Sequence, residues 1–187
     1  MDVIEAIYHR RAVRDFTDRP VERQTIEKLI DAAIQAPSAM NVQPWAFAVV
    51  ADRAKLAAVS DSAKAYLLNH LSPQSPLVHL RDDLANPTFN IFYNAPALVV
   101  ICATSLEPGA SEDCALAAQN FMLAAHAYGL GTCWIGLSRP WLDQPEGKAA
   151  LGVPRNYIPV GPIILGYPRG TAEVHPRHVP AVVWNAA

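Results

Sequence analysis

Three arginines stand within five residues near the N-terminus: Arg10, Arg11 and Arg14. Arg10 and Arg14 are one helical turn apart, so a helix continuing through them would place both guanidinium groups on one face. Two guanidinium forks on one face suit a phosphate, which accepts paired, charge-assisted hydrogen bonds. The alternative is a solvated helix end, where cations favour the helix dipole. The spacing alone leaves both interpretations open.

A second group of polar side chains lies in the stretch 36–45, between a predicted helix and a predicted strand. Ser38, Asn41 and Gln43 offer hydroxyl and amide groups on a loop stiffened by proline. These groups are suited to binding the hydroxyls of a polar ligand. An ordinary helix-to-strand connection would use the same residue types, so the loop by itself favours neither interpretation.

Glycines flank a short apolar segment that contains Cys133 and Trp134. The chain has no Gly-x-x-x-x-Gly-Lys loop, and no Gly-x-Gly-x-x-Gly follows a predicted strand, which excludes the common mononucleotide and dinucleotide loops. Glycines beside a strand instead allow backbone amides to approach a flat ligand closely. We expect Cys133 to be a packed thiol rather than a nucleophile, because no partner histidine is indicated.

The elements that position these residues follow from apolar periodicity and from proline. Helical periodicity predicts helices over 2–9, 21–36, 112–128 and 143–151. Apolar runs rich in β-branched residues predict strands over 46–51, 97–103, 132–137 and 158–165. Helices and strands do not alternate regularly, as they would in a parallel βαβ fold, so we expect the α+β class.

The length of 187 residues suits one domain with a substantial core, and we expect a single domain over 1–187. Residues 52–94 hold three prolines among short helical pieces, and an aromatic cluster of Phe89, Phe92 and Tyr93. We expect this segment to be a variable lid or substrate segment. Residues 169–187 are expected to form a C-terminal tail.

Composition and charge exclude several classes of protein. With 51% hydrophobic residues and a formal net charge of −2, the chain is neither disordered nor a general nucleic-acid binder. The start of the chain has no signal-peptide pattern, and no apolar run is long enough to span a bilayer. We therefore expect a cytoplasmic protein with no membrane partner.

The cysteines and histidines indicate no metal site. Cys102, Cys114 and Cys133 are odd in number and widely spaced, and each lies in an apolar run, so we expect packed, reduced thiols. His175 and His178 flank Pro176 and Arg177, and proline prevents the helical His pair that would chelate a metal.

The predicted helix 112–128 is apolar on almost every side. Such a helix must be buried on most of its surface. In a chain of this size a second copy most easily covers one of its sides, so we expect a homodimer.

Five blocks of the sequence occur in the order found in the FMN-dependent nitroreductase family, which the chain resembles over residues 3–168. The ordered set carries the resemblance. The blocks are Arg10-Arg11-Ala12-Val13-Arg14-Asp15-Phe16, Ala36-Pro37-Ser38 with Asn41-Val42-Gln43-Pro44-Trp45, Asn94-Ala95-Pro96, Gly129-Leu130-Gly131-Thr132-Cys133-Trp134-Ile135-Gly136, and Pro159-Val160-Gly161-Pro162-Ile163-Ile164-Leu165-Gly166-Tyr167-Pro168. The resemblance implies a mostly antiparallel sheet flanked by helices and an intertwined homodimer with two FMN sites at its interface.

The same resemblance implies roles for individual residues. The FMN phosphate, ribityl chain and pyrimidine edge would be held by Arg10, Arg11, Ala12 and Arg14, the last near flavin N1 and O2. The FMN of the partner chain would be reached by Ser38, Ala39, Asn41 and Gln43. Flavin N5 and O4 would lie beside the backbone of Ile135, Gly136 and Leu137. The basic residues that complete the phosphate site would be Arg177 and His178.

The implied activity is NAD(P)H-dependent reduction of nitroaromatic, quinone or related small aromatic acceptors through flavin N5, in a ping-pong cycle. Arg14 would stabilise the anionic reduced flavin electrostatically, and no other catalytic side chain is required. The absence of a ferredoxin-like cysteine cluster favours NADH or NADPH as the donor. Fold does not fix chemistry. A specialised reaction (ene reduction, reductive dehalogenation or flavin fragmentation) and a non-enzymatic FMN-binding protein therefore remain alternatives.

Overall fold

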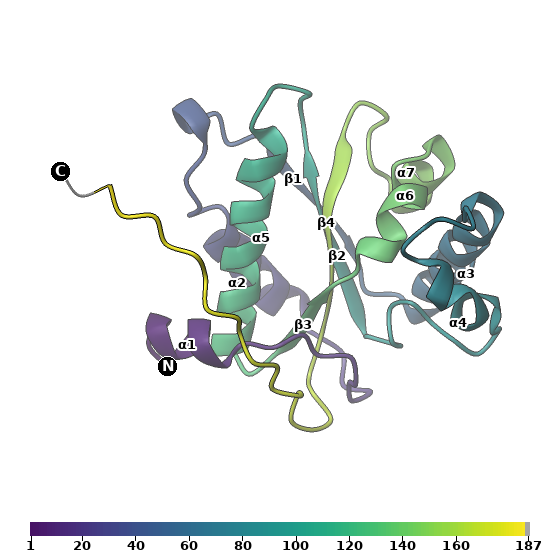
Figure 1. The fold of residues 1–187 in the computed structure, drawn as a ribbon, viewed down its shortest axis with the longest axis horizontal. Coiled ribbons are helices and arrows are strands. Elements are labelled where there is room, and N and C mark those ends of the chain that lie inside the picture. The colour runs from purple at the N-terminus through teal and green to yellow at the C-terminus, as the bar shows by residue number, and fades with distance from the viewer. Residues whose placement is uncertain (186–187) are drawn as a thin grey trace.

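Four strands form one antiparallel sheet in the computed structural model, which describes residues 1–185 (Figure 1). The strand order is β1-β2-β4-β3. The strands are β1 (Trp45–Val50), β2 (Ala97–Ala103), β3 (Gly131–Trp134) and β4 (Ile158–Gly166). The antiparallel pairing and the flanking helices confirm the predicted α+β class. The last two residues of the expected domain 1–187 and tail 169–187 lie outside the described residues.

Strand β2 is buried along its whole length and divides the core in two. Because side chains alternate along a strand, Val99 and Ile101 enter one core and Leu98 and Val100 enter the other. Helices α2 (Arg23–Ala33) and α5 (Ala110–Ala127) cover the first face of the sheet (Figure 1). The second face is covered by α3 (Arg53–His70), α4 (Arg81–Ala85), α6 (Arg139–Leu142) and α7 (Pro145–Leu151).

The segment 52–94 begins with one helix of 18 residues, α3, where short helical pieces were expected. Leu56, Val59, Ala63 and Leu67 recur at three- and four-residue steps, and all four are buried in the second core. The prolines of this segment lie beyond the end of the helix, so they do not interrupt it. The rest of the segment holds η2 (Val78–Leu80) and α4.

Two elements end three residues earlier than predicted, and the other predicted boundaries differ from the observed ones by at most two residues. The strand expected over 132–137 ends at Trp134, because the chain turns into the short 3-10 helix η3 (Gly136–Ser138), which leads into α6. The helix expected over 21–36 ends at Ala33, and turn hydrogen bonds carry the chain from there to Pro37. No helix in the described residues has both the length and the apolar character of a membrane span.

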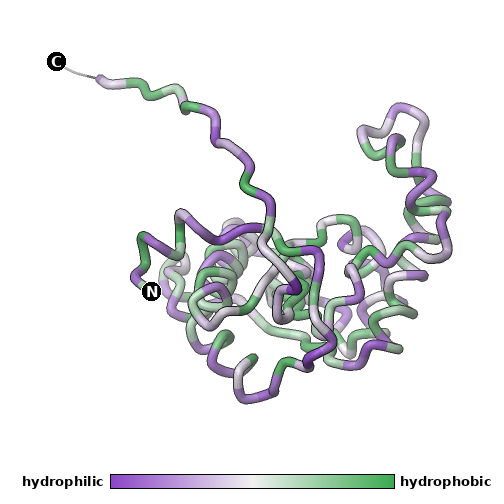
Figure 2. Tube along the Cα trace, turned by 90° about the horizontal axis from the view of Figure 1, so that it is seen from below, coloured by the Kyte–Doolittle hydropathy of each residue, from purple (hydrophilic) through white to green (hydrophobic). Residues whose placement is uncertain are grey.

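The C-terminal residues 170–185 contain no helix or strand, and the end of this tail projects away from the rest of the chain (Figures 1 and 2). Large apolar side chains are carried on this tail. Val179 and Val183 are each 94% exposed, and Trp184 is 85% exposed. Nothing within the described part of one chain covers them.

Candidate functional site

The arginine-rich stretch 10–14 is extended, so the helix predicted over 2–9 does not continue through the arginines. Helix α1 (Val3–His9) ends where Arg10 takes φ −59° and ψ 131°. Ala12 then forms a parallel bridge with Thr132 of β3, and the Val13 N–H donates to the Thr132 carbonyl at 2.9 Å. An extended chain puts alternate residues on one side, so Arg10 and Arg14 still share a side.

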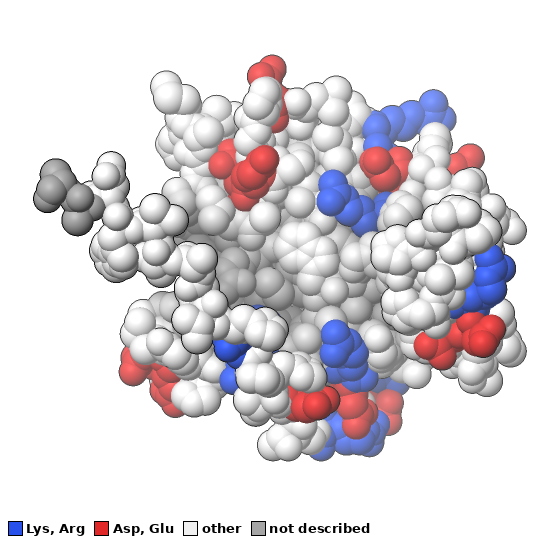
Figure 3. Space-filling view, viewed as in Figure 1, with Lys and Arg blue, Asp and Glu red and all other residues white. Residues whose placement is uncertain are grey.

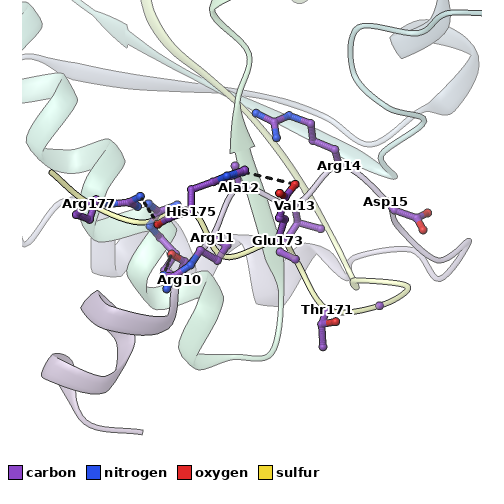
Figure 4. A pocket seen from close by; sticks show the side chains of 12 residues that line it. Arg10, Arg11, Ala12, Val13, Arg14, Asp15, Thr171, Glu173, His175 and Arg177 are labelled. Carbon is purple, nitrogen blue, oxygen red and sulfur yellow. Dashed lines mark hydrogen bonds and ion pairs between the residues drawn. The ribbon is translucent and has the colours of Figure 1, made fainter.

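A cavity of about 420 Å³ lies against this stretch (Figure 4). Its N-terminal wall is formed by residues 10–15, including Arg10, Arg11, Ala12 and Arg14. The C-terminal tail supplies the opposite wall, with Gly170 to Glu173, His175 and Arg177. The structure therefore places Arg177, from the C-terminal tail, at the same cavity as the arginines of residues 10–14.

Positive charge is concentrated in this cavity. Burial and the charges of Arg11 and Arg177 lower the pKa of the Arg10 guanidinium. Within residues 1–185, no ion pair with an acidic side chain involves Arg10, Arg11, Arg14 or Arg177. Convergent guanidinium groups without acidic partners favour a ligand that carries more than one negative charge.

The two acidic side chains at the cavity have other partners. Asp15 pairs with Arg169 at 3.2 Å, and Glu173 lies 3.8 Å from the His175 ring (Figure 4). Both contacts lie in exposed positions, where ion pairs contribute little. The acids therefore do not neutralise the arginine cluster.

The Arg11 side chain also caps the C-terminal end of α1. Its Nη1 donates to the carbonyls of Tyr8 at 2.7 Å and Arg10 at 2.9 Å, at the C-terminal end of α1. Carbonyls at that end of a helix lack intrahelical donors. Its Nε is buried and has no partner among the described residues. Arg11 thus stabilises the helix end while its positive charge lies at the cavity.

Arg14 has an aromatic ring and a thiol as neighbours. Its guanidinium carbon is 5.9 Å from the centroid of the Tyr93 ring, within cation–π range. Cys133 is buried, and burial raises the pKa of its thiol, although Arg14 and Arg10 act in the opposite direction. Cys133 is therefore a packed, protonated thiol at neutral pH, as the sequence predicted.

The polar loop 38–43 has strained backbone. Met40, Asn41 and Gln43 have φ of 52°, 56° and 53°. This left-handed region costs a non-glycine residue roughly 1–2 kcal/mol. Inside the loop, Ser38 Oγ accepts a hydrogen bond from the Gln43 N–H at 2.9 Å, and Gln43 Nε2 donates to Asn41 Oδ1 at 2.9 Å. The three predicted ligand side chains are thus linked to one another.

The loop is tied to helix α5 by a residue that the sequence analysis missed. The Ala39 N–H donates to both carboxylate oxygens of Asp113, at 3.2 and 3.3 Å. Asp113 is 7% exposed. The signal for it was weak, because one acidic residue in the first turn of a helix is also explained by the helix dipole.

The third predicted group lies at the end of β3. The parallel bridge between Ala12 and Thr132 makes the arginine stretch run beside β3, so the chain reaches Ile135 and Gly136 just past the level of Arg14. Ile135 is buried and its N–H donates to the Pro162 carbonyl at 2.8 Å, so that N–H is already used. Gly136 has empty space beside its Cα, since a Cβ there would meet no atom within 4 Å.

Within one chain, the arginine stretch and the loop 38–43 lie at opposite ends of α5 (Figure 1). Asp113, in the first turn, contacts the loop. His126, in the last turn, lies near Arg10 and Arg11, whose charges lower its pKa after the larger effect of burial. A helix of 18 residues is about 27 Å long. One chain therefore does not bring both groups to the same small ligand.

His178, unlike its neighbour Arg177, does not line the cavity; the tail histidine that does is His175. The face drawn in Figure 3 shows basic and acidic side chains intermixed around an uncharged central hollow. On that face of the described residues no continuous basic surface is present. The basic cluster is thus local, as a small anionic ligand requires.

Comparison with known proteins identifies relatives along most of the chain. It is 39% identical over 173 residues to "Putative NADH dehydrogenase/NAD(P)H nitroreductase" of Methanothermobacter thermautotrophicus, covering 90% of this chain and 78% of that protein. It is 30% identical to the 5,6-dimethylbenzimidazole synthase of Rhodospirillum rubrum, covering 94% of this chain and 85% of that protein.

A solved structure shows the same fold over the whole chain. The nitroreductase with bound FMN from Bacteroides fragilis superposes with a TM-score of 0.84 and is 30% identical, covering 100% of this chain and 99% of that one. The model of the Nitroreductase family matches residues 7–167, which include the arginine stretch, the loop 38–43 and β3. The chain therefore belongs to the nitroreductase family.

Proposed function

We propose that the protein is an FMN-dependent oxidoreductase that uses NADH or NADPH to reduce small aromatic acceptors such as nitroaromatics or quinones. The observation that carries the proposal is the cavity in which Arg10, Arg11, Arg14 and Arg177 meet without acidic partners. The relative named as an NAD(P)H nitroreductase and the FMN-bound structure of the same fold support the choice of donor and cofactor.

The donor set of the cavity fits FMN. A phosphate monoester carries about −1.5 to −2 charges near neutral pH. Arg10 and Arg177 would hold this phosphate with Arg11 adding charge, and the backbone at Ala12 would lie beside the ribityl chain. Each charge-assisted hydrogen bond of this kind contributes about 1.5–3 kcal/mol.

When bound, FMN would supply two-electron redox chemistry between the nicotinamide donor and the acceptor, which we propose to follow a ping-pong sequence. Arg14 would face the pyrimidine edge, where its charge stabilises negative charge that develops there. The backbone of Ile135, Gly136 and Leu137 would lie at the other edge of the ring system, where Gly136 leaves open space. No side-chain nucleophile takes part, in agreement with the protonated Cys133.

The site would be completed by a second copy of the chain. Because the loop 38–43 and the arginine stretch lie at opposite ends of α5, Ser38, Ala39, Asn41 and Gln43 would reach the FMN held by the partner's arginines. Apolar surface that a partner would cover is present on α1, where Val3 and Ile4 are 65% and 59% exposed, and on the tail. Leu116 of α5 is 46% exposed as well. We therefore propose an intertwined homodimer.

The acceptor would be bound near two aromatic rings of the segment 52–94, which we propose as the substrate segment. Phe89 and Tyr93 meet edge to face with ring centroids 6.1 Å apart, and Tyr93 lies beside Arg14. Phe92, the third member of the predicted aromatic cluster, is fully buried in the second core and is unavailable to a ligand.

A second candidate is a specialised flavin chemistry on the same scaffold. The specific observation in its favour is the 30% identity to a 5,6-dimethylbenzimidazole synthase over 94% of this chain. A purified sample given FMN, reductant and oxygen would form a benzimidazole product under that alternative. Under the main proposal it would instead turn over NAD(P)H with the added acceptor.

The test is the absorbance of the purified protein, followed during anaerobic addition of NADH or NADPH and then of a nitroaromatic or quinone. A bound-flavin spectrum that bleaches with the donor and returns with the acceptor supports the proposal. Arg10→Ala should weaken FMN affinity roughly 10- to 150-fold, whereas Arg155→Ala, exposed and outside the cavity, should not. A protein that takes up no FMN, or bound flavin that neither nicotinamide reduces, would refute it.

A further inference from the structure

Residues 38–43 have few hydrogen bonds to the rest of the protein. Their bonds are mostly internal: the Asn41 N–H donates to the Ser38 carbonyl at 3.0 Å, and the Gln43 N–H donates to Ser38 Oγ at 2.9 Å. In the described part of the chain, the Asp113 carboxylate is the one group outside the loop and its flanking residues that hydrogen-bonds to it. Asp113 is therefore the one hydrogen-bond partner that ties residues 38–43 themselves to a distant part of the described chain.

The loop cannot hold its shape through backbone preference. Met40, Asn41 and Gln43 all have positive φ, and none of them is glycine. Such a conformation persists only where surrounding contacts impose it. Met40 is 95% exposed and Val42 is 64% exposed, so packing within the chain does not impose it either.

Asp113 is well placed to hold the loop 38–43 in this conformation. It is 7% exposed and lies in the first turn of α5, where the helix dipole favours a negative charge. No basic side chain among residues 1–185 forms an ion pair with it. Both carboxylate oxygens are instead directed at the Ala39 N–H. A buried carboxylate is costly unless it has such a partner.

We propose that Asp113 is a positioning residue for the cofactor site: its carboxylate holds the Ala39 N–H and so fixes Ser38, Asn41 and Gln43 in the arrangement that meets FMN. Asp113 itself does not touch the cofactor. This inference rests on the proposed function, because it requires the loop to bind FMN.

The test compares FMN affinity in three variants of the full chain. Asp113→Ala removes the acceptor and should raise the FMN Kd about tenfold. Asp113→Asn keeps an oxygen that can accept from the Ala39 N–H, so it should restore the Kd to within about threefold of the native value. Glu112→Ala is the matched control, because it removes an exposed acid from the same turn of α5 without touching the loop.

A double substitution separates positioning from a general loss of stability. If Asp113 acts through the loop, Asp113→Ala combined with Ser38→Ala should raise the Kd by less than the product of the two single effects. Thermal unfolding of each apo variant reports its folding. An unchanged Kd in Asp113→Ala, or equal losses in the Ala and Asn variants, would overturn the proposal. Failure of the native chain to bind FMN would instead refute the proposed function.

Discussion

Arg177 and Arg10 come from opposite ends of the chain and line the same cavity, where the charge of Arg177, after burial and Arg11, helps to lower the pKa of the Arg10 guanidinium. Two cations held this close repel each other in the absence of an anion. Under the proposed function, the phosphate of FMN would relieve this repulsion by accepting hydrogen bonds from both guanidinium groups.

Arg177 and His178 are neighbours, but the structure places only Arg177 at the cavity. Arg177→Ala should weaken FMN binding by roughly 10-fold or more, because a charge-assisted bond to phosphate is lost. His178→Ala should have a clearly smaller effect. Fluorescence titration of FMN into the two apo variants compares them directly, and an equal or larger loss in His178→Ala would show that the tail is arranged differently around the ligand.

The stability of the protein should fall in acid partly through His126. Burial, followed by the charges of Arg10, His9 and Arg11, lowers the pKa of this imidazole below 6.5. The unfolded chain therefore binds this proton more readily than the folded chain. The contribution to stability is full above the unfolded pKa and is lost as the pH falls through the folded pKa.

Urea denaturation at pH 7.5 and at pH 5.5 measures this effect. The native protein should lose more free energy of unfolding between the two pH values than His126→Gln does, because the variant cannot take up the proton. The same pH dependence in both proteins would mean that His126 does not contribute.

Gly131 sets the distance between β3 and the arginine stretch. A Cβ at this position would lie 2.7 Å from two side-chain carbons of Val13. Gly131→Ala should therefore push the stretch 10–14 away from β3 and destabilise the protein by about 1–3 kcal/mol. Gly136→Ala is the control for stability, since a Cβ there has open space. The stability of both variants is measured by thermal unfolding. Equal unfolding temperatures for Gly131→Ala and Gly136→Ala would contradict this role of Gly131.

Lys64 fixes the segment that carries Phe89 and Tyr93. Its side chain is 6% exposed, and its Nζ donates to the carbonyls of Phe89 at 2.6 Å and Asn86 at 3.2 Å. Lys64→Met keeps the apolar stem but leaves the Phe89 carbonyl without its donor, which should cost about 1–3 kcal/mol. Lys55→Met, on the exposed side of the same helix, should change urea stability little. An equal effect of the two changes would be evidence against the role of Lys64.

The local sequence was sufficient to predict an element wherever a single residue pattern determined it. Strand β2 was predicted with its observed boundaries because Ala97–Ala103 is uniformly apolar and follows proline. The extended form of the arginine stretch could not be predicted, because its bridge partner, Thr132, is distant in the sequence. The contact of Asp113 with Ala39 joins a side chain to a backbone N–H, which leaves no trace in residue type.

Heterodimers of two differently mutated chains test whether each cofactor site is shared between two copies. One protomer would carry Arg10→Ala, and the other Ser38→Ala with Asn41→Ala, each with a different affinity tag. If a site combines the arginines of one protomer with the loop of its partner, the heterodimer has one site with both defects and one intact site. It should then bind one FMN with native affinity, although neither mutant homodimer does. A heterodimer with no site of native affinity would contradict the shared site.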